Sequence, residues 1–436
     1  MVGAETFDLE ITDVAHGGVF VGRHEGRVVF VPDAIPGERV RVRRTTEPGD
    51  DGKRYWRAEL LEVLDASPHR RPHVWRQADV EVPPELRPGG ADFGHIDLVH
   101  QRALKLHVLR DALRRIGGMP DAAVSIAEAS PVRSDAGDLL AQETADGTGW
   151  RTRVSLHVDA DGQIGPYASR SHRVIAVDAL PLATPEVERA ALALRRGDPG
   201  RIDLVQPADG RVRTLPRPHD GPRPPAARET VIERVGGRDF RVDAGGFWQV
   251  HRLAAHSLTE LVTARLRAQA DGAHAAHAVD PDAWHLDLYG GVGLFAAALA
   301  GLGGATTRVT TVESDPRATR HAAENLAEWA RADARTARVD RWLPQLARQA
   351  SGAQRARLSQ GVILLDPPRS GAGRAVVEHI AALTPQTVVY VACDPVALAR
   401  DLATFREHGY TTGTVDAVDL FPHSHHVESV AVLRRG

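Results

Sequence analysis

From residue 284 to the C-terminus, the chain alternates between apolar strands and helices, and this alternation restricts the fold more than any other feature. Five segments have the composition of buried strands: WHLDLYG (284–290), RVTTVES (308–314), GVILLDPP (361–368), TVVYVACD (387–394) and HVESVAVLRR (426–435). Strands that alternate with helices predict a doubly wound α/β sheet. We expect functional side chains at the carboxyl ends of these strands, where such sheets bind ligands.

Two further units are predicted upstream, because 436 residues suit two or three domains. Residues 1–65 contain short apolar alternations separated by turns with glycine or proline, which is typical of a small five-stranded barrel. Residues 66–240 combine an amphipathic helix at 98–117 with strand-like segments between 150 and 180, which predicts a central α+β domain. Residues 241–436 then form the C-terminal α/β domain.

The composition excludes several classes of protein. Hydrophobic residues make up 42% and charged residues 25%, as in soluble globular proteins. No apolar run reaches the roughly 18 residues of a membrane span, and the acidic N-terminus does not read as a signal peptide. We therefore expect a cytoplasmic protein without membrane contact, and a monomer by default. The single cysteine excludes an internal disulfide and a cysteine-held zinc or iron–sulfur site.

A net charge of −3 means that a nucleic-acid partner would need a local basic surface. Two stretches are candidates. Arginines alternate along residues 39–44, and they either face a phosphate backbone or protect a solvated edge strand. Cations mix with aromatic side chains between residues 151 and 173, which either bind and stack RNA or form a polar outer face of a sheet.

A glycine-rich turn, LDLYGGVGLF at 286–295, follows the first strand of the α/β region. Glycine lets the backbone approach a ligand, and the N-terminus of the following helix favours a carboxylate. Asp287 can orient the loop or bind an ammonium group, Glu313 can bind the hydroxyls of a ribose, and Asp340 can accept from an adenine amine. The turn lacks the glycine patterns of dinucleotide-binding and P-loop sites. S-adenosylmethionine, which has no phosphate, fits best.

Reactive groups stand at three further strand ends. Asp366 follows one strand, Cys393 follows the next, and Glu428 enters the last. Cys393 also precedes a helix, whose N-terminus lowers the pKa of a thiol. A thiolate that adds to a ring carbon and a carboxylate that removes a proton are the groups that methylation of uracil carbon 5 requires. Asp366 or Arg369 would polarise the ring.

Three histidines, at positions 423, 425 and 426, precede Glu428. No second cluster of ligating residues accompanies them, so a metal site is not expected. We expect them to help position Glu428 or to line a loop.

Together these residues resemble the RNA 5-methyluridine methyltransferases, which modify tRNA or 23S rRNA. AHGGVFVGRHEGRVVFVPDAIPGERV is similar to a TRAM domain, a small OB-like RNA-binding barrel, and YASRSHRVIAVDALPL to the central RNA-binding domain of the family. FWQV, LDLYGGVG, VESD, DPPR, CDP and HHVESV follow in the order of the family. The resemblance implies a C-terminal class I, Rossmann-like methyltransferase domain, and RNA as the partner.

The same motifs carry the functional residues of the family onto this chain. The resemblance implies that Cys393 adds to carbon 6 of uracil and that Glu428 removes the proton from carbon 5. It also implies a set of contacts to S-adenosylmethionine. These are Gln249, Tyr289, Glu313, Asp340 and Asp366.

The chain departs from the family at several positions. Ala91 and Gly94 stand where many members carry cysteines, so no iron–sulfur cluster is expected. Asp394 replaces the usual asparagine after the nucleophile, Gly290 a frequent cysteine, and His251 a common asparagine. Two alternatives remain: a nitrogen-directed RNA methyltransferase, in which DPPR serves as an Asn/Asp-Pro-Pro-aromatic motif, and a non-catalytic RNA-binding protein.

Overall fold

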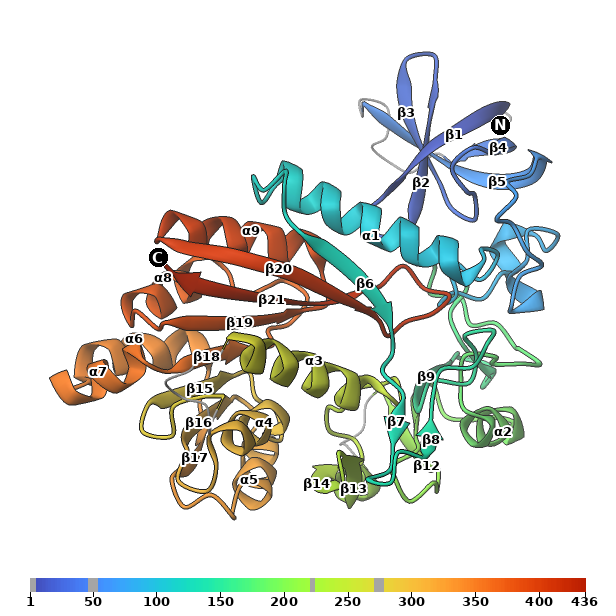
Figure 1. Ribbon diagram of the computed structural model, residues 1–436. Coiled ribbons are helices and arrows are strands. Elements are labelled where there is room, and N and C mark those ends of the chain that lie inside the picture. The colour runs from blue at the N-terminus through green and yellow to red at the C-terminus, as the bar shows by residue number, and fades with distance from the viewer. Residues whose placement is uncertain (1–4, 46–53, 220–223, 270–277) are drawn as a thin grey trace.

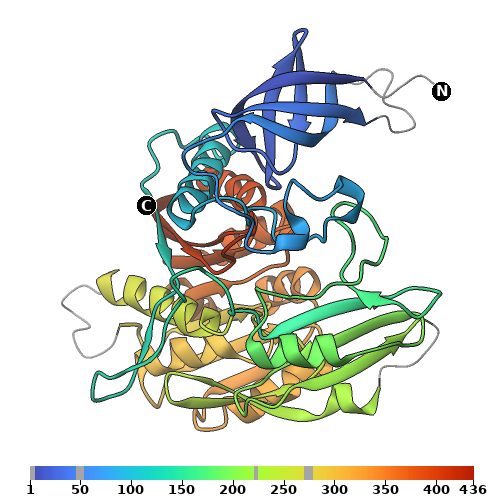
Figure 2. The same ribbon diagram turned by 90° about the vertical axis from the view of Figure 1, so that its right-hand side faces the viewer.

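The computed structural model describes residues 5–45, 54–219, 224–269 and 278–436. The N-terminal strands form a barrel that lies above a larger body (Figure 1). In that body the C-terminal α/β sheet lies beside the smaller sheets of the central part, and the segment that follows the barrel lies between the barrel and both (Figure 2). The predicted fold class, an α/β C-terminal domain with an N-terminal barrel, is confirmed.

Five strands close the barrel in the order β1-β2-β3-β5-β4. They are β1 (Thr6–Ala15), β2 (Val19–His24), β3 (Arg27–Val31), β4 (Arg39–Thr45) and β5 (Tyr55–Asp65). Alternate side chains point inward, and Phe20, Val29 and Val42 are fully buried in the barrel core. Because the barrel is closed, the arginine-rich strand β4 pairs on both sides and is not an edge strand.

Acidic residues on the neighbouring strands neutralise the arginines of β4. Arg41 lies 3.0 Å from Asp8 on β1 and 3.0 Å from Glu62 on β5, and Arg43 lies 2.8 Å from Glu59 on β5. Exposed ion pairs contribute only about 0–1 kcal/mol each, so their main effect here is on surface charge. The arginines of β4 therefore do not protect an edge strand, and acidic neighbours compensate the charges of Arg41 and Arg43.

The segment after β5 holds the barrel on the body. Phe93, Ile96 and Leu104 complete the hydrophobic core of the barrel from outside it. The Arg70 guanidinium donates to the fully buried carboxylate of Glu38 at 2.6 Å. Removing one partner of such a buried pair typically costs about 3–5 kcal/mol, so the docking is specific.

The central part of the chain forms smaller sheets. A four-stranded sheet has the order β10-β9-β11-β12, and helix α2 packs against it. Its elements are β9 (Arg153–Val158), β10 (Ile164–Gly165), α2 (Pro185–Ala193), β11 (Gly200–Val205) and β12 (Arg213–Pro218). Two hairpins are β7 (Val132–Arg133) with β8 (Leu139–Ala141) and β13 (Thr230–Val235) with β14 (Arg238–Asp243). Short 3₁₀ helices are η1 (Arg76–Ala78), η2 (Pro84–Leu86) and η3 (Pro225–Arg228).

Eight strands form the C-terminal sheet in the order β17-β16-β15-β18-β19-β21-β20-β6. Neighbours are parallel, except that β21 runs antiparallel to β19 and β20. The strands are β6 (Val124–Glu128), β15 (Trp284–Leu288), β16 (Arg308–Glu313), β17 (Ala332–Thr336), β18 (Val362–Leu365), β19 (Thr387–Ala392), β20 (Tyr410–Asp419) and β21 (Glu428–Arg435). The helices are α3 (Ala254–Gln269), α4 (Leu294–Gly303), α5 (Pro316–Asn325), α6 (Val339–Gln349), α7 (Gly352–Ser359), α8 (Arg374–Ala382) and α9 (Pro395–Glu407).

Strands β17 and β20 were not among the five strands predicted from the sequence, and neither was β6, whose residues VSIAE are only partly buried or exposed. Strand β6 adds to β20 as a parallel edge strand. Helix α1 (Leu98–Arg115), which corresponds to the helix expected at 98–117, precedes it and packs on α9. The chain between the barrel and the central sheet thus extends the C-terminal sheet.

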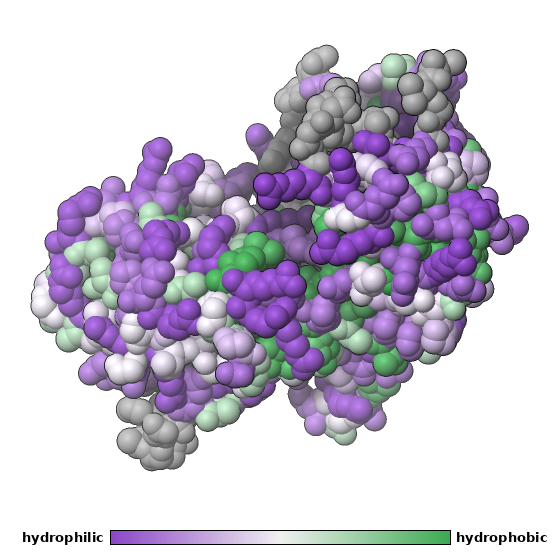
Figure 3. Space-filling model, turned by 90° about the horizontal axis from the view of Figure 1, so that it is seen from above, coloured by the Kyte–Doolittle hydropathy of each residue, from purple (hydrophilic) through white to green (hydrophobic). Residues whose placement is uncertain are grey.

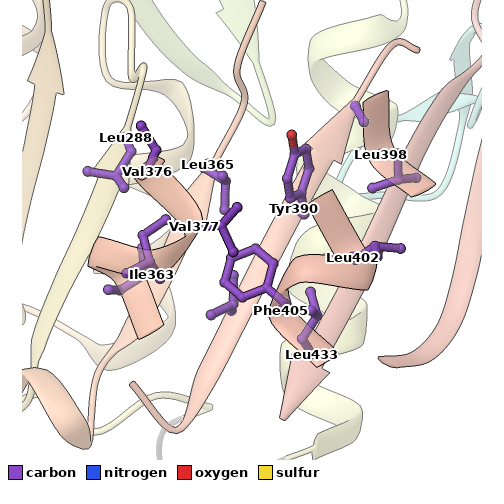
Figure 4. Packing of buried hydrophobic residues seen from close by; sticks show 14 of the residues in the cluster. Leu288, Ile363, Leu365, Val376, Val377, Tyr390, Leu398, Leu402, Phe405 and Leu433 are labelled. Atoms are coloured by element: carbon purple, nitrogen blue, oxygen red, sulfur yellow. The ribbon is translucent and has the colours of Figure 1, made fainter. Parts of the chain in front are cut away.

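A hydrophobic layer between this sheet and helices α8 and α9 holds the strand ends in place (Figure 4). Tyr390 on β19 is fully buried, and its hydroxyl donates to Asp401 on α9 at 2.7 Å. Leu402 and Phe405 on α9 are also fully buried in the layer. Truncating such side chains typically costs about 2–5 kcal/mol, so the end of β19 is firmly placed.

Hydrophilic residues cover most of the face seen from above, and hydrophobic residues gather in smaller patches between them (Figure 3). Among the residues described, no helix is long and apolar enough to cross a bilayer. Phe247, with 74% of its surface exposed, is one of the most exposed large hydrophobic residues.

Candidate active site

A cavity of about 1170 Å³ lies at the carboxyl ends of β15, β16, β18 and β19. Seven residues predicted from the sequence line it: Gln249, Tyr289, Glu313, Asp340, Asp366, Cys393 and Glu428. Pockets for one small ligand typically measure about 300–1,000 Å³, so this cavity has room for a cofactor together with a nucleotide.

Left-handed backbone shapes the glycine-rich turn after β15. Tyr289 has a φ of +63° and Gly291 a φ of +54°. A non-glycine residue in this region is uncommon, and such strain tends to occur at ligand sites. A Cβ atom at Gly290 would overlap the Thr311 side chain and lie 2.5 Å from an oxygen of Asp287. The turn therefore packs so closely on Thr311 and Asp287 that position 290 has no room for a side chain.

Glu313 at the end of β16 holds the turn and faces the cavity. One of its carboxylate oxygens accepts the backbone N–H of Gly291 at 3.2 Å, and the other accepts that of Asp315 at 2.8 Å. These bonds fix a carboxylate where ribose hydroxyls can donate to it. Burial and the charge of Asp340 raise the pKa of Tyr289 to about 12, so Tyr289 keeps its hydroxyl proton and can donate it.

Asp287 supports the turn from below and does not line the cavity. One of its oxygens accepts the N–H of Ala296 at 3.1 Å and the hydroxyl of Thr311 at 3.0 Å. Its other oxygen is buried and has no hydrogen-bond partner among the described residues. Burial raises the pKa of Asp287 to about 7. Of the two roles expected for it, orientation of the loop is the one that this geometry fits.

Gln249 belongs to an anchored segment that follows β14. The Arg153 guanidinium donates to the carbonyl of Gly246 at 2.7 Å, and the N–H of Thr152 donates to the carbonyl of Val250 at 2.8 Å. Arg153 begins strand β9 of the central sheet, and Thr152 directly precedes it. The central part of the chain thus holds in place the segment 245–250, which lines one side of the cavity.

Asp340 lies in the first turn of α6, at the rim of the cavity. Its side chain is 46% exposed, and Arg338 donates to both carboxylate oxygens, at 3.0 and 2.9 Å. These bonds lower the pKa of Asp340, so it remains an ionised acceptor. That state suits acceptance from an amine.

Strand register brings the thiol and the carboxyl group together. Ala392, the last residue of β19, pairs with Ser429 of the antiparallel strand β21. The next pair in this register is Cys393 with Glu428. Cys393 is partly buried, and Glu428 is only 5% exposed.

The electrostatics of this pair differ from the expectation that a helix N-terminus lowers the pKa of the thiol. Burial and the carboxylates of Glu428 and Asp366 raise the pKa of Cys393 to about 12, and Arg369 opposes this rise only in part. Burial and Asp366 raise the pKa of Glu428 well above its usual range. Burial and the charge of Asp287 raise that of Asp366 to about 7. A thiolate therefore requires compensation of negative charge in the site.

Asp394 does not line the large cavity. One of its oxygens accepts the N–H of Ala397 at 2.8 Å and so caps helix α9. The other lies 3.2 Å from Nε2 of His16, in the turn between β1 and β2 of the barrel. Aspartate and asparagine cap helices about equally well, so this substitution preserves the start of the helix.

The three histidines before Glu428 point to different partners. The backbone N–H of His423 donates to Gln101 on α1, the ring of His425 lies 2.7 Å from Asp92, and His426 lines the cavity. No group of three or more histidine, cysteine or acidic side chains within the described ranges is arranged to hold a metal ion.

A histidine ring fills the region in which many family members carry cysteines. A Cβ atom at Gly94 would overlap the ring of His73, whose Nε2 lies 3.1 Å from the carbonyl oxygen of Ala91. Ala91 and Gly94 are therefore packed against a side chain of the segment itself.

Two cavity residues had no assigned role in this site from the sequence. Phe247 exposes its ring two residues before Gln249, and its place beside the FWQV glutamine was the available signal. Arg151 belongs to the cationic stretch between residues 151 and 173, but only the fold brings it into the cavity. Burial and the charge of Arg369 lower the pKa of Arg151, so an anion bound near both guanidinium groups would be stabilised.

The fold and the cavity define a class I methyltransferase with an attached barrel, and comparison with known proteins agrees. The family model described as tRNA (uracil-5-)-methyltransferase matches residues 275–436, and the TRAM domain model matches residues 1–45. The chain is 38% identical to an uncharacterized RNA methyltransferase of Streptomyces avermitilis, over 98% of both chains. It is 37% identical to one of Streptomyces coelicolor, over 99% of this chain and 93% of that one. The chain belongs to the TRAM-containing RNA methyltransferases of the uracil-5 family.

A solved structure shares the fold over the whole chain. It is the tRNA (uracil-54, C5)-methyltransferase of Pyrococcus abyssi in complex with S-adenosyl-L-homocysteine. It is 20% identical, with a TM-score of 0.64, and the match covers 98% of this chain and 100% of that one. The predicted family, enzyme class and methyl donor, S-adenosylmethionine, are confirmed.

Proposed function

We propose that this enzyme methylates carbon 5 of a uridine in tRNA or rRNA, with Cys393 as the nucleophile and Glu428 as the general base. The observation that carries the proposal is the register of β19 and β21, which sets the thiol beside the buried carboxyl group in one cavity. Carbon 5 and carbon 6 of uracil are bonded to each other, so the two groups must act on neighbouring atoms of one ring.

S-adenosylmethionine fits the part of the cavity between β15, β16 and α6. The fixed carboxylate of Glu313 can accept from the ribose, and Asp340 can accept from the adenine amine. Gln249, Tyr289 and Asp366 line the same cavity and would contact the remaining parts of the cofactor. When bound, this cofactor supplies a methyl group on a positively charged sulfur.

The reaction then uses two residues, one after the other. The Cys393 thiolate adds to carbon 6, and the electron pair of the 5,6 double bond moves toward oxygen 4 as an enolate. Carbon 5 takes up the methyl group while it still holds its hydrogen. Glu428 removes that proton, the double bond forms again, and the thiolate leaves. Arg369, whose charge opposes the raised pKa of Cys393, can also stabilise the enolate oxygen.

The target base must leave its stack to reach this pocket. The exposed ring of Phe247 at the cavity offers a surface on which an unstacked base can lie. Arg151 and Arg369 can then take up a phosphate of the extruded nucleotide. In this proposal the barrel and the central part bind the surrounding RNA.

Nucleoside mass spectrometry of RNA from a strain that lacks the gene provides the test. The wild-type enzyme, added with S-adenosylmethionine, should form 5-methyluridine in either the tRNA or the rRNA fraction, and Cys393→Ala should form none. Glu428→Gln should slow turnover by about 10²–10⁴-fold and accumulate a covalent RNA adduct on a denaturing gel. The variant that combines Cys393→Ala with Glu428→Gln is the control, and it should form no adduct because it lacks the thiol.

Three outcomes would contradict the proposal. Methylation by Cys393→Ala would remove the covalent mechanism. A product methylated on nitrogen would favour a nitrogen-directed enzyme. Calorimetry without binding of S-adenosylmethionine would favour a non-catalytic RNA-binding protein.

A further inference from the structure

The turn between β1 and β2 brings the barrel against the strand end that carries Cys393. His16 in this turn places Nε2 3.2 Å from Oδ2 of Asp394, the residue that directly follows the thiol. The side chain of Asp394 is 22% exposed and that of His16 is 46% exposed. This is a contact between residues far apart in sequence, at the start of helix α9.

The shape of the turn permits this approach. Gly17 and Gly18 have φ values of +85° and +71°, in the left-handed region that favours glycine. A Cβ atom at Gly18 would lie 2.6 Å from Cβ of His425 in the loop before Glu428, so a larger residue would push the barrel away. The turn is therefore fitted to the active-site loop.

A second, smaller cavity of about 130 Å³ lies at this junction. Cys393 lines it as well as the large cavity, so this residue lies between the substrate side and the barrel side. The titratable or charged side chains that face this junction are those of His16, Lys105, Arg369, Cys393, Asp394, His425 and His426. Asp394 is the carboxylic acid in this set.

We propose that His16 is a positioning residue that pairs with Asp394 and so keeps the negative charge of this carboxylate from opposing ionisation of Cys393. The proposal rests on the proposed function of Cys393 as the nucleophile. It assigns a role in the reaction to the barrel beyond RNA binding: the barrel supplies the imidazole that pairs with the acid directly after the nucleophile.

The direction of each electrostatic effect agrees with this role. A carboxylate beside a thiol raises the pKa of the thiol, and Asp394 contributes to the raised pKa of Cys393. The bond to Asp394 raises the pKa of His16 above its ordinary value of 6.5, although burial opposes this. Burial opposes ionisation of Asp394, but the bonds from His16 and from the N–H of Ala397 outweigh it and lower its pKa.

The pair should therefore depend on pH. Because the pKa of His16 is raised, the charged pair is complete below that pKa and is lost as pH rises through it. Above it, Asp394 stands uncompensated beside Cys393.

The single cysteine of the chain allows a direct test. Alkylation by iodoacetamide follows the thiolate fraction, so its rate measures ionisation of Cys393 without RNA or turnover. In the full-length protein at pH 7, His16→Ala should lower this rate about 3- to 10-fold, which corresponds to a rise of roughly half to one unit in the thiol pKa. At pH 9 the ratio of variant to wild type should approach one.

Asp394→Asn separates charge compensation from a structural role. Asparagine still caps the helix but carries no charge, so His16→Ala combined with Asp394→Asn should recover the wild-type rate. His107→Ala is the matched control, because it removes a different contact between barrel and body, the 3.0 Å pair with Asp13. It should leave the rate unchanged.

An unchanged rate in His16→Ala, or a double variant as slow as His16→Ala, would overturn the inference. The test also stays separate from the proposed function. If alkylation follows the expected pattern but Cys393→Ala still methylates RNA, charge compensation stands and the covalent mechanism fails.

Discussion

Asp287→Asn tests whether the acid beneath the cofactor turn is neutral in the folded protein. Asparagine keeps an oxygen that can accept from Ala296 and Thr311, as the carboxylate does at 3.1 and 3.0 Å. The substitution removes the possibility of negative charge at a side chain that is fully buried, and it places an NH2 group where the buried oxygen without a partner lies among the described residues; the cost of that group is the same at every pH. Any effect on stability that changes with pH then reports the titration of this group.

The magnitude follows from the raised pKa of Asp287, about 7 against an ordinary 3.8. The difference is about three units, and each unit corresponds to about 1.4 kcal/mol. An acid whose folded-state pKa is raised weakens the fold as pH rises from its unfolded pKa to its folded pKa, and not below that window. Wild type should therefore lose about 4 kcal/mol relative to Asp287→Asn between pH 4 and pH 7.

Urea unfolding at pH 5 and pH 8 measures this difference. Over that interval the advantage of Asp287→Asn should grow by about 3 kcal/mol, because part of the titration already lies below pH 5. Asp282→Asn is the control for the substitution itself, since Asp282 is in the same domain and its side chain is 81% exposed. Its difference from wild type should be the same at both pH values.

An advantage of Asp287→Asn that is equal at pH 5 and pH 8 would refute this reasoning. It would mean that the two hydrogen bonds and the helix that follows stabilise the carboxylate enough to offset its burial. The turn would then present a fixed negative charge beneath the cofactor, and the raised pKa of Asp366, which depends partly on Asp287, would need the same revision.

Three further predictions concern the stability and binding of the enzyme. Lys105→Met should lower the free energy of unfolding by about 1.5–3 kcal/mol in urea, because it removes a charged donor 2.5 Å from Asp419, where both side chains are 0% exposed, and leaves Arg102 as the cation that pairs with Asp419; a loss below 1 kcal/mol would contradict this. Phe247→Ala should raise the KM for RNA about tenfold through lost stacking and leave calorimetric binding of S-adenosylmethionine unchanged; equal weakening of both would place the ring in the cofactor site instead. Glu313→Gln should weaken S-adenosylmethionine about tenfold by calorimetry, since the ribose loses a charged acceptor, and unchanged affinity would remove Glu313 from the site.

Local sequence patterns predicted five of the eight described strands of the C-terminal sheet, namely β15, β16, β18, β19 and β21, and the positions of the reactive groups. Apolar strands and their following helices are adjacent in the chain, so the ends of β18 and β19 are marked by Asp366 and Cys393 directly. Parallel strands share one edge, and that rule alone places these residues in one region. That rule does not place Glu428, which begins the antiparallel strand β21; its role was predicted from the required chemistry and from the family resemblance.

Strand β6 shows where this approach stops. Its five residues bury little and form too short a run to predict a strand, and they pair along the edge that β20 offers. Whether such a segment forms a strand depends on its pairing in the tertiary structure and not on the β-propensity of its own residues.

Sequence alone determined which groups the site contains: one thiol, its neighbouring acids and a glycine-rich turn. Tertiary structure decided their ionisation, because a pKa depends on burial and on charges that approach through space. Cys393 illustrates the difference, since its place before a helix predicted a low pKa, whereas Glu428, Asp366 and burial raise it. The contact of His16 with Asp394 likewise exists only because the barrel folds back onto the far end of the chain.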